Sequence, residues 1–263
     1  MADAYVHGYA TAEQQRFVAQ AEHWREELIL DGTHLPAGTR LLEVGCGVGA
    51  VLGVLGQAFC GITLAGVDIE EQQVLAARAH LARLGLTADI RCADAVALPY
   101  ADASFDHVWM MWFLEHVADP TAVLREAHRV LALEGELTAI EVDYNSTVAT
   151  PASDATATLF SAVAAAMDRH GRSDTGRHLG RWLIEAGFRR VDPGERRLRY
   201  SGDGLARQLP YVIAVIESTL PELAAAADVQ EGRLRAGVAD LHALGSKPGA
   251  SLGWTVYKAR ARP

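Results

Sequence analysis

A glycine-rich loop stands out among the residues whose types and spacing could do chemistry. Residues 45–50 read Gly-Cys-Gly-Val-Gly-Ala directly after the apolar run at 41–44. Alternate glycines allow a tight turn, let a ligand approach the backbone, and place a helix N-terminus beside that ligand. The pattern therefore predicts a loop that binds a nucleotide-like molecule.

The glycines alone do not choose between two kinds of nucleotide ligand. Gly45-x-Gly47-x-x-Ala50, followed by Asp68 about 20 residues later, also satisfies the permissive dinucleotide pattern. A nicotinamide-dependent oxidoreductase is therefore one alternative. Glu43, two residues before the first glycine, would repel a pyrophosphate but could hold a cationic ligand or the amides of the loop itself.

Two further carboxylates follow the next two expected strands. Asp68 ends the second strand, where it could accept from both hydroxyls of a ribose, and Asp94 follows the third, where it could accept from an adenine amine. Aspartate is also a common cap or turn residue. With Glu43, these side chains predict an acidic edge suited to a nucleoside that carries positive charge.

Four motifs in this order resemble one enzyme family. They occupy residues 43–49 (Glu-x-Gly-x-Gly-x-Gly), 66–69 (Gly-Val-Asp-Ile), 94–99 (Asp-Ala-x-x-Leu-Pro) and 105–106 (Phe-Asp). Together they resemble the class I S-adenosylmethionine-dependent methyltransferases of the small-molecule type, with the methyltransferase domain 11 pattern. The resemblance covers roughly residues 5–144 and implies S-adenosyl-L-methionine as the cofactor.

The resemblance also implies roles for single residues. Asp68 would hold the ribose, Ile69 would lie against the adenine, and Asp94 and Ala95 would contact its amine and ring. The first motif would be formed by Glu43, Gly45, Gly47 and Gly49.

Three more cofactor contacts are implied by residues outside these motifs. The family reads Ser-Phe-x-Leu-x-His after its fourth strand, whereas residues 111–116 read Met-Trp-Phe-Leu-Glu-His. The main chain of Met111 would then contact the ammonium group of the cofactor. Tyr9 and Arg16, in a segment similar to the cofactor-covering first helix of some of these enzymes, are candidates for its carboxylate.

Methyl transfer needs an in-line nucleophile about 3–3.5 Å from the methyl carbon, and a base only where the acceptor is a hydroxyl or a carbon acid. His116, after the fourth strand, and Asp143 and Tyr144, after the fifth, are the candidate catalytic residues. Each has a structural alternative, as a backbone-bonded histidine or a loop cap. Oxygen, nitrogen and carbon acceptors all stay open.

Aromatic residues suggest the nature of the acceptor. Trp112 and Phe113 are expected to form the bottom of an apolar pocket. Further apolar residues on later helices would extend this pocket, namely Phe160, Met167, Tyr211 and Ile216. These predict a small, partly apolar acceptor such as a natural-product intermediate. A protein that binds the cofactor without methylating, such as a cyclase or a binding module, is a second alternative.

The elements that must position these residues follow from the hydrophobic pattern. Strands are expected at 41–44, 62–67, 88–91, 105–112, 136–142, 189–200 and 253–262, with helices at 11–30, 50–59, 70–84, 120–133, 152–170, 175–188 and within 205–243. This alternation predicts an α/β fold, a doubly wound Rossmann-like sheet of seven mostly parallel strands that binds ligand at the carboxyl ends of its strands.

The expected domain organisation is one elaborated domain. Residues 1–37 would form a cofactor-covering N-terminal helix, and residues 38–263 the methyltransferase domain, with helical lid insertions near 152–170 and 203–245. No Pro/Gly-rich linker separates a second domain.

Composition excludes several function classes. The 263 residues include 24 Lys and Arg against 33 Asp and Glu, a net charge of −9, which disfavours nucleic acid as a partner. No run approaches the ~18 apolar residues of a membrane span, and the first 15 residues lack the form of a secretory signal. Three cysteines without C-x-x-C spacing suggest a reduced compartment, so we expect a cytoplasmic protein without a metal. The oligomeric state, monomer or homodimer, stays open.

Overall fold

The computed structural model of the chain describes residues 11–263, which divide into two compact units. The core unit holds residues 11–140, 178–194 and 258–263, and the extension unit holds residues 141–177 and 195–257. Two long strands, β5 (Leu131–Thr150) and β8 (Ser251–Arg262), contribute to both units. Each unit is described by itself.

The core unit is built on an eight-stranded sheet, seven strands of which follow the order β3-β2-β1-β4-β5-β8-β6, while the eighth, β7 (Glu195–Ser201), pairs with β8. The first five strands of this order run parallel, and β8 pairs antiparallel with β6. The bounds of the shorter strands are β1 Arg40–Val44, β2 Thr63–Asp68, β3 Ala88–Cys92, β4 Phe105–Met111 and β6 Arg190–Asp192. This arrangement confirms the doubly wound, mostly parallel sheet predicted from the sequence.

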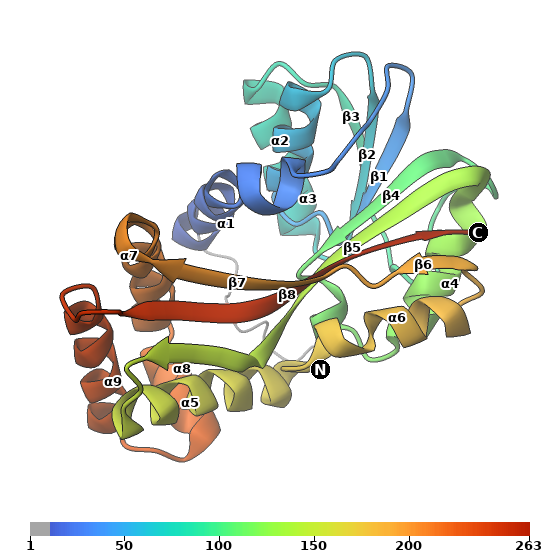
Figure 1. Cartoon of the computed structure of the whole chain (residues 1–263). Coiled ribbons are helices and arrows are strands. Elements are labelled where there is room, and N and C mark those ends of the chain that lie inside the picture. The colour runs from blue at the N-terminus through green and yellow to red at the C-terminus, as the bar shows by residue number, and fades with distance from the viewer. Residues whose placement is uncertain (1–10) are drawn as a thin grey trace. The chain divides into compact units, whose positions relative to one another are not determined.

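Helices cover both faces of this sheet. In Figure 1, α2 and α3 lie on one side of strands β1 to β4, and α4 and α6 lie on the other. The helices of this part of the chain are α1 Thr11–His23, η1 Arg25–Leu30, α2 Ala50–Ala58, α3 Glu71–Arg83, η2 Leu114–His116, α4 Pro120–Val130 and α6 Thr175–Glu185. The single helix expected at 11–30 is thus an α-helix followed by the π-helical turn η1.

Burial on both faces explains the apolar strands of the core unit. In β4, Val108, Trp109 and Met110 are fully buried, as is typical of a parallel strand between two helical layers. The polar exception is His107, whose Nε2 lies 3.0 Å from Thr138 Oγ1. Burial lowers the pKa of His107 to about 4, so the imidazole is neutral at physiological pH.

A buried lysine closes the end of the π-helical turn. Lys258 Nζ donates to the carbonyl oxygens of Leu28 (2.7 Å) and Asp31 (2.7 Å) and to Thr33 Oγ1 (3.0 Å). Carbonyl groups at a helix C-terminus lack partners inside the helix, and a cation there also complements the helix dipole. Lys258 therefore fixes η1 to strand β8.

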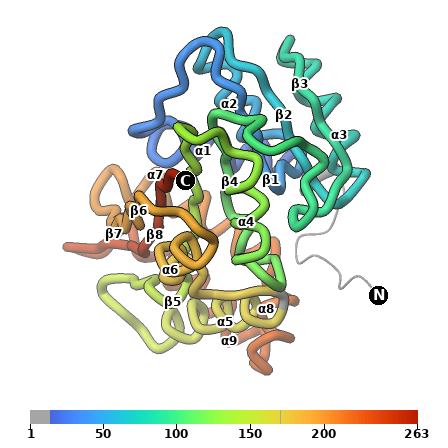
Figure 2. The backbone as a smooth tube through the Cα atoms, turned by 90° about the vertical axis from the view of Figure 1, so that its right-hand side faces the viewer, coloured from blue at the N-terminus to red at the C-terminus, as the bar shows by residue number. Residues whose placement is uncertain are grey.

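The extension unit combines three strand segments with a helical cluster. β7 (Glu195–Ser201) pairs antiparallel with β8. In Figure 2, α5, α8 and α9 lie side by side. The helices are α5 Asp154–His170, α7 Gly202–Ser218, α8 Leu220–Ala227 and α9 Glu231–Leu244. The strand expected at 189–200 is divided into β6 and β7 at Pro193 and Gly194, where a Cβ on the glycine would overlap the backbone of Lys258.

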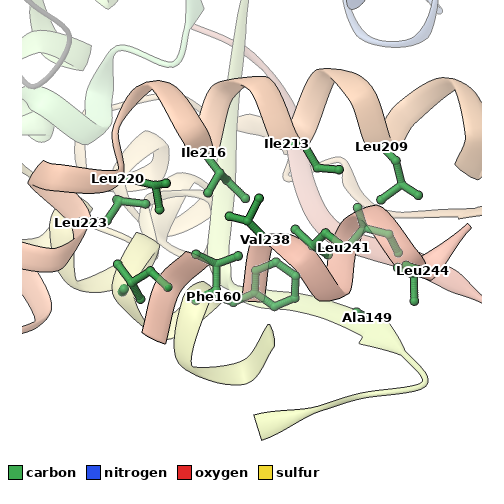
Figure 3. Packing of buried hydrophobic residues seen from close by; sticks show 14 of the residues in the cluster. Ala149, Phe160, Leu209, Ile213, Ile216, Leu220, Leu223, Val238, Leu241 and Leu244 are labelled. Atoms are coloured by element: carbon green, nitrogen blue, oxygen red, sulfur yellow. The ribbon is translucent and has the colours of Figure 1, made fainter. Parts of the chain in front are cut away.

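The helical cluster has its own hydrophobic core. Figure 3 shows Ile213 and Ile216 of α7 directed toward Val238 and Leu241 of α9, with Phe160 of α5 among them. Phe160 and Ile216 were expected to face an acceptor, but both are buried in this cluster. The reason is that the apolar stripes of these helices face one another, so the two side chains are used for helix packing.

Among the described residues, no single helix is long and apolar enough to cross a membrane; α7 and α8 meet the length and hydropathy test only as a pair bent by 66°. Among the residues whose side chains the structure describes, no three His, Cys, Asp or Glu gather in a group that could hold a metal ion.

Candidate functional site

The glycine loop follows β1 at the carboxyl edge of the sheet. The amides of Gly45 and Cys46 both donate to the carbonyl oxygen of Val67 (2.9 Å each), which ties the loop to the end of β2. A Cβ on Gly45 would overlap the ring of Phe113, and a Cβ on Gly49 would lie 3.2 Å from Ala77 Cβ in α3. These two glycines therefore permit close packing within the protein.

Gly47, the middle glycine, faces open space. Its φ is +48°, and among the described residues no heavy atom would lie within 4 Å of a Cβ placed there. A backbone with left-handed φ and no side chain can be approached closely by a ligand. The loop therefore leaves room above Gly47, as the sequence predicts for a nucleotide-type ligand.

Glu43 lies at the base of this loop and is 3% exposed. The backbone N–H of Leu52, in the first turn of α2, donates to its carboxylate, so Glu43 does hold an amide near the loop. Its Oε2 has no hydrogen-bond partner among the described residues. Burial raises the pKa of Glu43 well above its usual range, and a cation placed beside it would stabilise the charged form.

Asp68, at the end of β2, joins the loop to the next turn. Its Oδ2 accepts from the Gly47 amide (2.8 Å) and its Oδ1 from the Glu70 amide (3.0 Å). Burial raises the pKa of Asp68, while these two amides oppose the shift. A carboxylate offers about four acceptor sites, so capacity for two hydroxyl donors is left.

The register of β2 with β3 brings the adenine candidates to the same edge. Asp68 is paired with Cys92, which places Ile69 and Asp94 just beyond the ends of neighbouring strands. Ile69 is 65% exposed, an unusual state for isoleucine, and Asp94 is exposed with its Oδ1 accepting from the Val96 amide (3.1 Å). Ala95 is half-buried beside it. These positions fit a planar apolar group with an amine at its rim.

Two aromatic residues, Trp112 and Phe113, directly follow the end of strand β4. Met111 is buried at the last position of β4, and Trp112 follows with a φ of +51°, which is rare for a large side chain. The Trp112 amide donates to Ile140 O (2.9 Å), and its ring meets Trp24 edge to face at 6.2 Å. Strain of this kind collects at functional sites and persists only where surrounding contacts enforce it.

His116 lies in η2, directly after these aromatic residues. Its Nε2 is 3.4 Å from Glu115 Oε1, and the Glu115 side chain is 3% exposed. A buried carboxylate beside an imidazole orients the ring and stabilises its protonated form. The sequence gives no sign of this pairing, because neighbouring residues in a chain need not face one another.

Two further candidates come from the N-terminal segment. Tyr9 is outside the described residues. Arg16, in α1, donates to Gln20 Oε1 (3.4 Å) and lies over the Phe17 ring at 4.7 Å. The contact of Arg16 with a cofactor stays a prediction.

Asp143 and Tyr144 belong to the extension unit and lie inside β5, which continues to Thr150 instead of ending at residue 142. Asp143 is 2% exposed and accepts from Arg177 Nε (2.6 Å). The Tyr144 amide donates to Ser173 O (2.9 Å). Their catalytic roles stay predictions, as does the lid role of the helices in this unit.

Comparison with known proteins decides what kind of domain holds this site. Residues 42–139 match the protein family described as "Methyltransferase domain". This part of the chain is therefore similar to methyltransferase domains. The match spans β1 to the middle of β5 and confirms the resemblance to class I S-adenosylmethionine-dependent enzymes.

Two relatives of the chain are named as methyltransferases. The chain is 33% identical over 133 residues to methyltransferase GfsG of Streptomyces halstedii, covering 50% of this chain and 48% of that protein. It is 42% identical over 105 residues to the 27-O-demethylrifamycin SV methyltransferase of Amycolatopsis mediterranei, covering 39% and 38%. The chain thus spans less than half the length of these relatives.

A solved structure resembles most of the chain in fold. The [4+2]-cyclase SpnF superposes with a TM-score of 0.58 at 23% sequence identity, covering 96% of this chain and 81% of that one. At this identity the likeness concerns the fold alone. Folds of this class host more than one chemistry.

Proposed function

We propose that this protein transfers a methyl group from S-adenosylmethionine to a small, partly apolar acceptor by in-line displacement. The observation that carries the proposal is the buried Oε2 of Glu43, which has no hydrogen-bond partner among the described residues. A buried acidic oxygen next to an open glycine backbone is suited to a ligand that brings a cationic donor.

The donors and acceptors at this edge fit the cofactor. Glu43 and the Met111 main chain would hold its ammonium group, Asp68 its ribose, and Ile69 and Asp94, with Ala95, its adenine. When bound, S-adenosylmethionine supplies a methyl group on a positively charged sulfur, and the electrons of the broken carbon–sulfur bond stay on sulfur. Each of these residues either binds or orients the cofactor.

His116 is the residue proposed to handle the proton of the acceptor. An acceptor hydroxyl must lose its proton as its oxygen bonds to the methyl carbon, and a histidine beside a carboxylate can take that proton at neutral pH. The Glu115 oxygen at 3.4 Å would stabilise the resulting imidazolium. For an amine acceptor the same pair would only position the substrate.

The acceptor class is inferred from two observations. Trp112, directly after β4, is half-buried and packs against Trp24, so part of its apolar ring surface stays accessible. The relative in Amycolatopsis mediterranei is named for a rifamycin, a small molecule rather than a macromolecule. A natural-product intermediate with an apolar skeleton is therefore the acceptor we propose.

Calorimetric titration tests the cofactor part of this proposal. S-adenosylhomocysteine should bind the full chain, and NAD should not; the reverse result would favour an oxidoreductase. Asp68→Ala should weaken binding of S-adenosylhomocysteine about tenfold or more while the protein stays folded. Asp89→Ala is the matched control, because Asp89 is exposed and pairs only with Arg91 on the surface of β3. Equal affinity of the two variants would remove Asp68 from the site.

A further inference from the structure

The extension unit contains a hollow that the methyl-transfer scheme does not use. It has a volume of about 610 Å³ and is lined by residues of β5, β7, β8 and the start of α6. Sites for small molecules usually measure about 300–1,000 Å³. The hollow is therefore large enough for a small organic ligand.

Alternate residues of β7 supply positive charge to this hollow. Arg197 and Arg199 are both exposed and lie opposite Thr255 and Gly253 of β8. Because side chains alternate between the two faces of a strand, both guanidinium groups belong to the same face. Arg177, from α6, adds a third arginine to the lining.

The carboxylates of the hollow do not neutralise these arginines. Asp143 pairs with Arg177 at 2.6 Å, and Glu195 lies 3.5 Å from Arg197 in an exposed and therefore weak pair. Arg199 Nε donates to Ser251 Oγ at 3.2 Å, and no carboxylate of the described residues forms an ion pair with Arg199. The hollow thus has an excess positive charge within a chain whose net charge is −9.

The same hollow also has apolar lining. Val148 of β5 is 61% exposed, and it lines the hollow with Tyr257 of β8. Tyr257 pairs with Glu195 and so lies on the same face of the strands as Arg197 and Arg199. An exposed valine and a tyrosine ring beside the guanidinium groups provide two kinds of contact. A ligand that uses both must have an anionic end and an apolar body.

We propose that this hollow binds a small organic anion, a carboxylate or a phosphate monoester with an apolar body. Its anionic group is bound by Arg199, with Ser251 and Arg197 beside it, and its apolar part lies against Val148. Arg177 keeps donors for the ligand, because among the described residues Asp143 accepts from only one of its five N–H groups, Nε–H. This proposal does not depend on methyl transfer.

Titration of the full chain with three matched probes tests the proposal. Phenylacetate and phenyl phosphate carry the anion, and phenylacetamide has the same ring without charge. We expect saturable binding of at least one anion, weakened by added salt, and none of phenylacetamide. Saturating S-adenosylhomocysteine should leave this binding intact. Absence of anion binding at millimolar concentration, equal binding of phenylacetamide, or competition by S-adenosylhomocysteine would each overturn the proposal.

Arginine variants locate the bound anion. Arg199→Gln should weaken binding about tenfold, as expected for loss of one charge-assisted contact. Arg197→Gln, at a side chain that is 84% exposed, should also weaken binding, and it serves if Arg199→Gln does not fold. Arg233→Gln is the control, because Arg233 is exposed on α9 and outside the hollow. Wild-type affinity in a folded Arg199→Gln or Arg197→Gln variant would overturn the assignment.

Discussion

Two glycines of the loop should respond differently to replacement by alanine. Gly45→Ala should mainly lower the stability of the protein, and Gly47→Ala should mainly weaken cofactor binding. Gly45 and Gly47 both have left-handed φ values, +73° and +48°. A Cβ on Gly45 would lie within 2.8 Å of three ring atoms of Phe113, whereas a Cβ on Gly47 would meet no heavy atom of residues 11–263 within 4 Å. Gly45→Ala therefore disturbs packing, and Gly47→Ala changes only the space above the loop.

The expected magnitudes follow from these contacts. An alanine in the left-handed region costs roughly 1–2 kcal/mol, and overpacking against a ring adds about 1–3 kcal/mol. Gly45→Ala should thus lower the free energy of unfolding by about 2–5 kcal/mol, and Gly47→Ala by about 1–2 kcal/mol. At about 2–4 °C for each kcal/mol, Gly47→Ala should melt only a few degrees below the wild type.

The assay pairs thermal unfolding with calorimetric titration of S-adenosylhomocysteine. In Gly47→Ala the new methyl group occupies space proposed for the cofactor, and a loss of about 1.4 kcal/mol there corresponds to a tenfold weaker Kd. We expect Gly47→Ala to lose affinity by about tenfold or more while melting above Gly45→Ala. Wild-type affinity in folded Gly47→Ala would refute the reasoning, because the open space could not then belong to the cofactor.

Three further predictions concern stability and turnover. Lys258→Met should lower the free energy of unfolding by roughly 2–4 kcal/mol, because it orphans the carbonyl groups at the end of η1; unchanged chemical denaturation would contradict this. The pKa of His107 is about 4 when folded against an ordinary 6.5, so the unfolded chain binds the extra proton between these values. The free energy of unfolding should be highest above pH 6.5 and fall by about 3 kcal/mol toward pH 4, and His107→Asn should remove this pH dependence. Equal pH dependence in the wild type and in His107→Asn would contradict the prediction. His116→Ala should slow methyl transfer to a hydroxyl acceptor about 100-fold or more and leave the affinity for S-adenosylhomocysteine unchanged, whereas wild-type turnover would exclude His116 as the base.

The positions of the glycine loop and of Asp68 were predictable because local sequence and backbone geometry coincide there. Gly45, Gly47 and Asp68 follow strands whose order is set by the alternation of apolar and amphipathic segments. Parallel strands then bring their carboxyl ends to one edge. The sequence pattern could not predict that the Phe113 ring packs against Gly45, because that contact depends on the backbone conformation after β4.

The extension unit was less predictable because its boundaries fall inside continuous elements. β5 continues through Asp143 to Thr150, and β8 likewise contributes to both units, so no linker marks the division. An apolar run such as 136–142 indicates where a strand is buried, but not how far its polar continuation stays paired. The role of Lys258 was equally hidden, because its partners Leu28 and Asp31 are some 230 positions away in the chain.

Transfer of an isotope-labelled methyl group tests the central claim most directly. The full chain would be incubated with methyl-labelled S-adenosylmethionine and a panel of apolar hydroxyl, amine and carbon-acid acceptors, and the products weighed by mass spectrometry. The account predicts a labelled product and equimolar S-adenosylhomocysteine, both lost in Asp68→Ala and retained in Asp89→Ala. An acceptor that is chemically changed without gaining the label, by a chain that binds S-adenosylhomocysteine, would contradict methyl transfer and favour a non-methylating reaction on this fold.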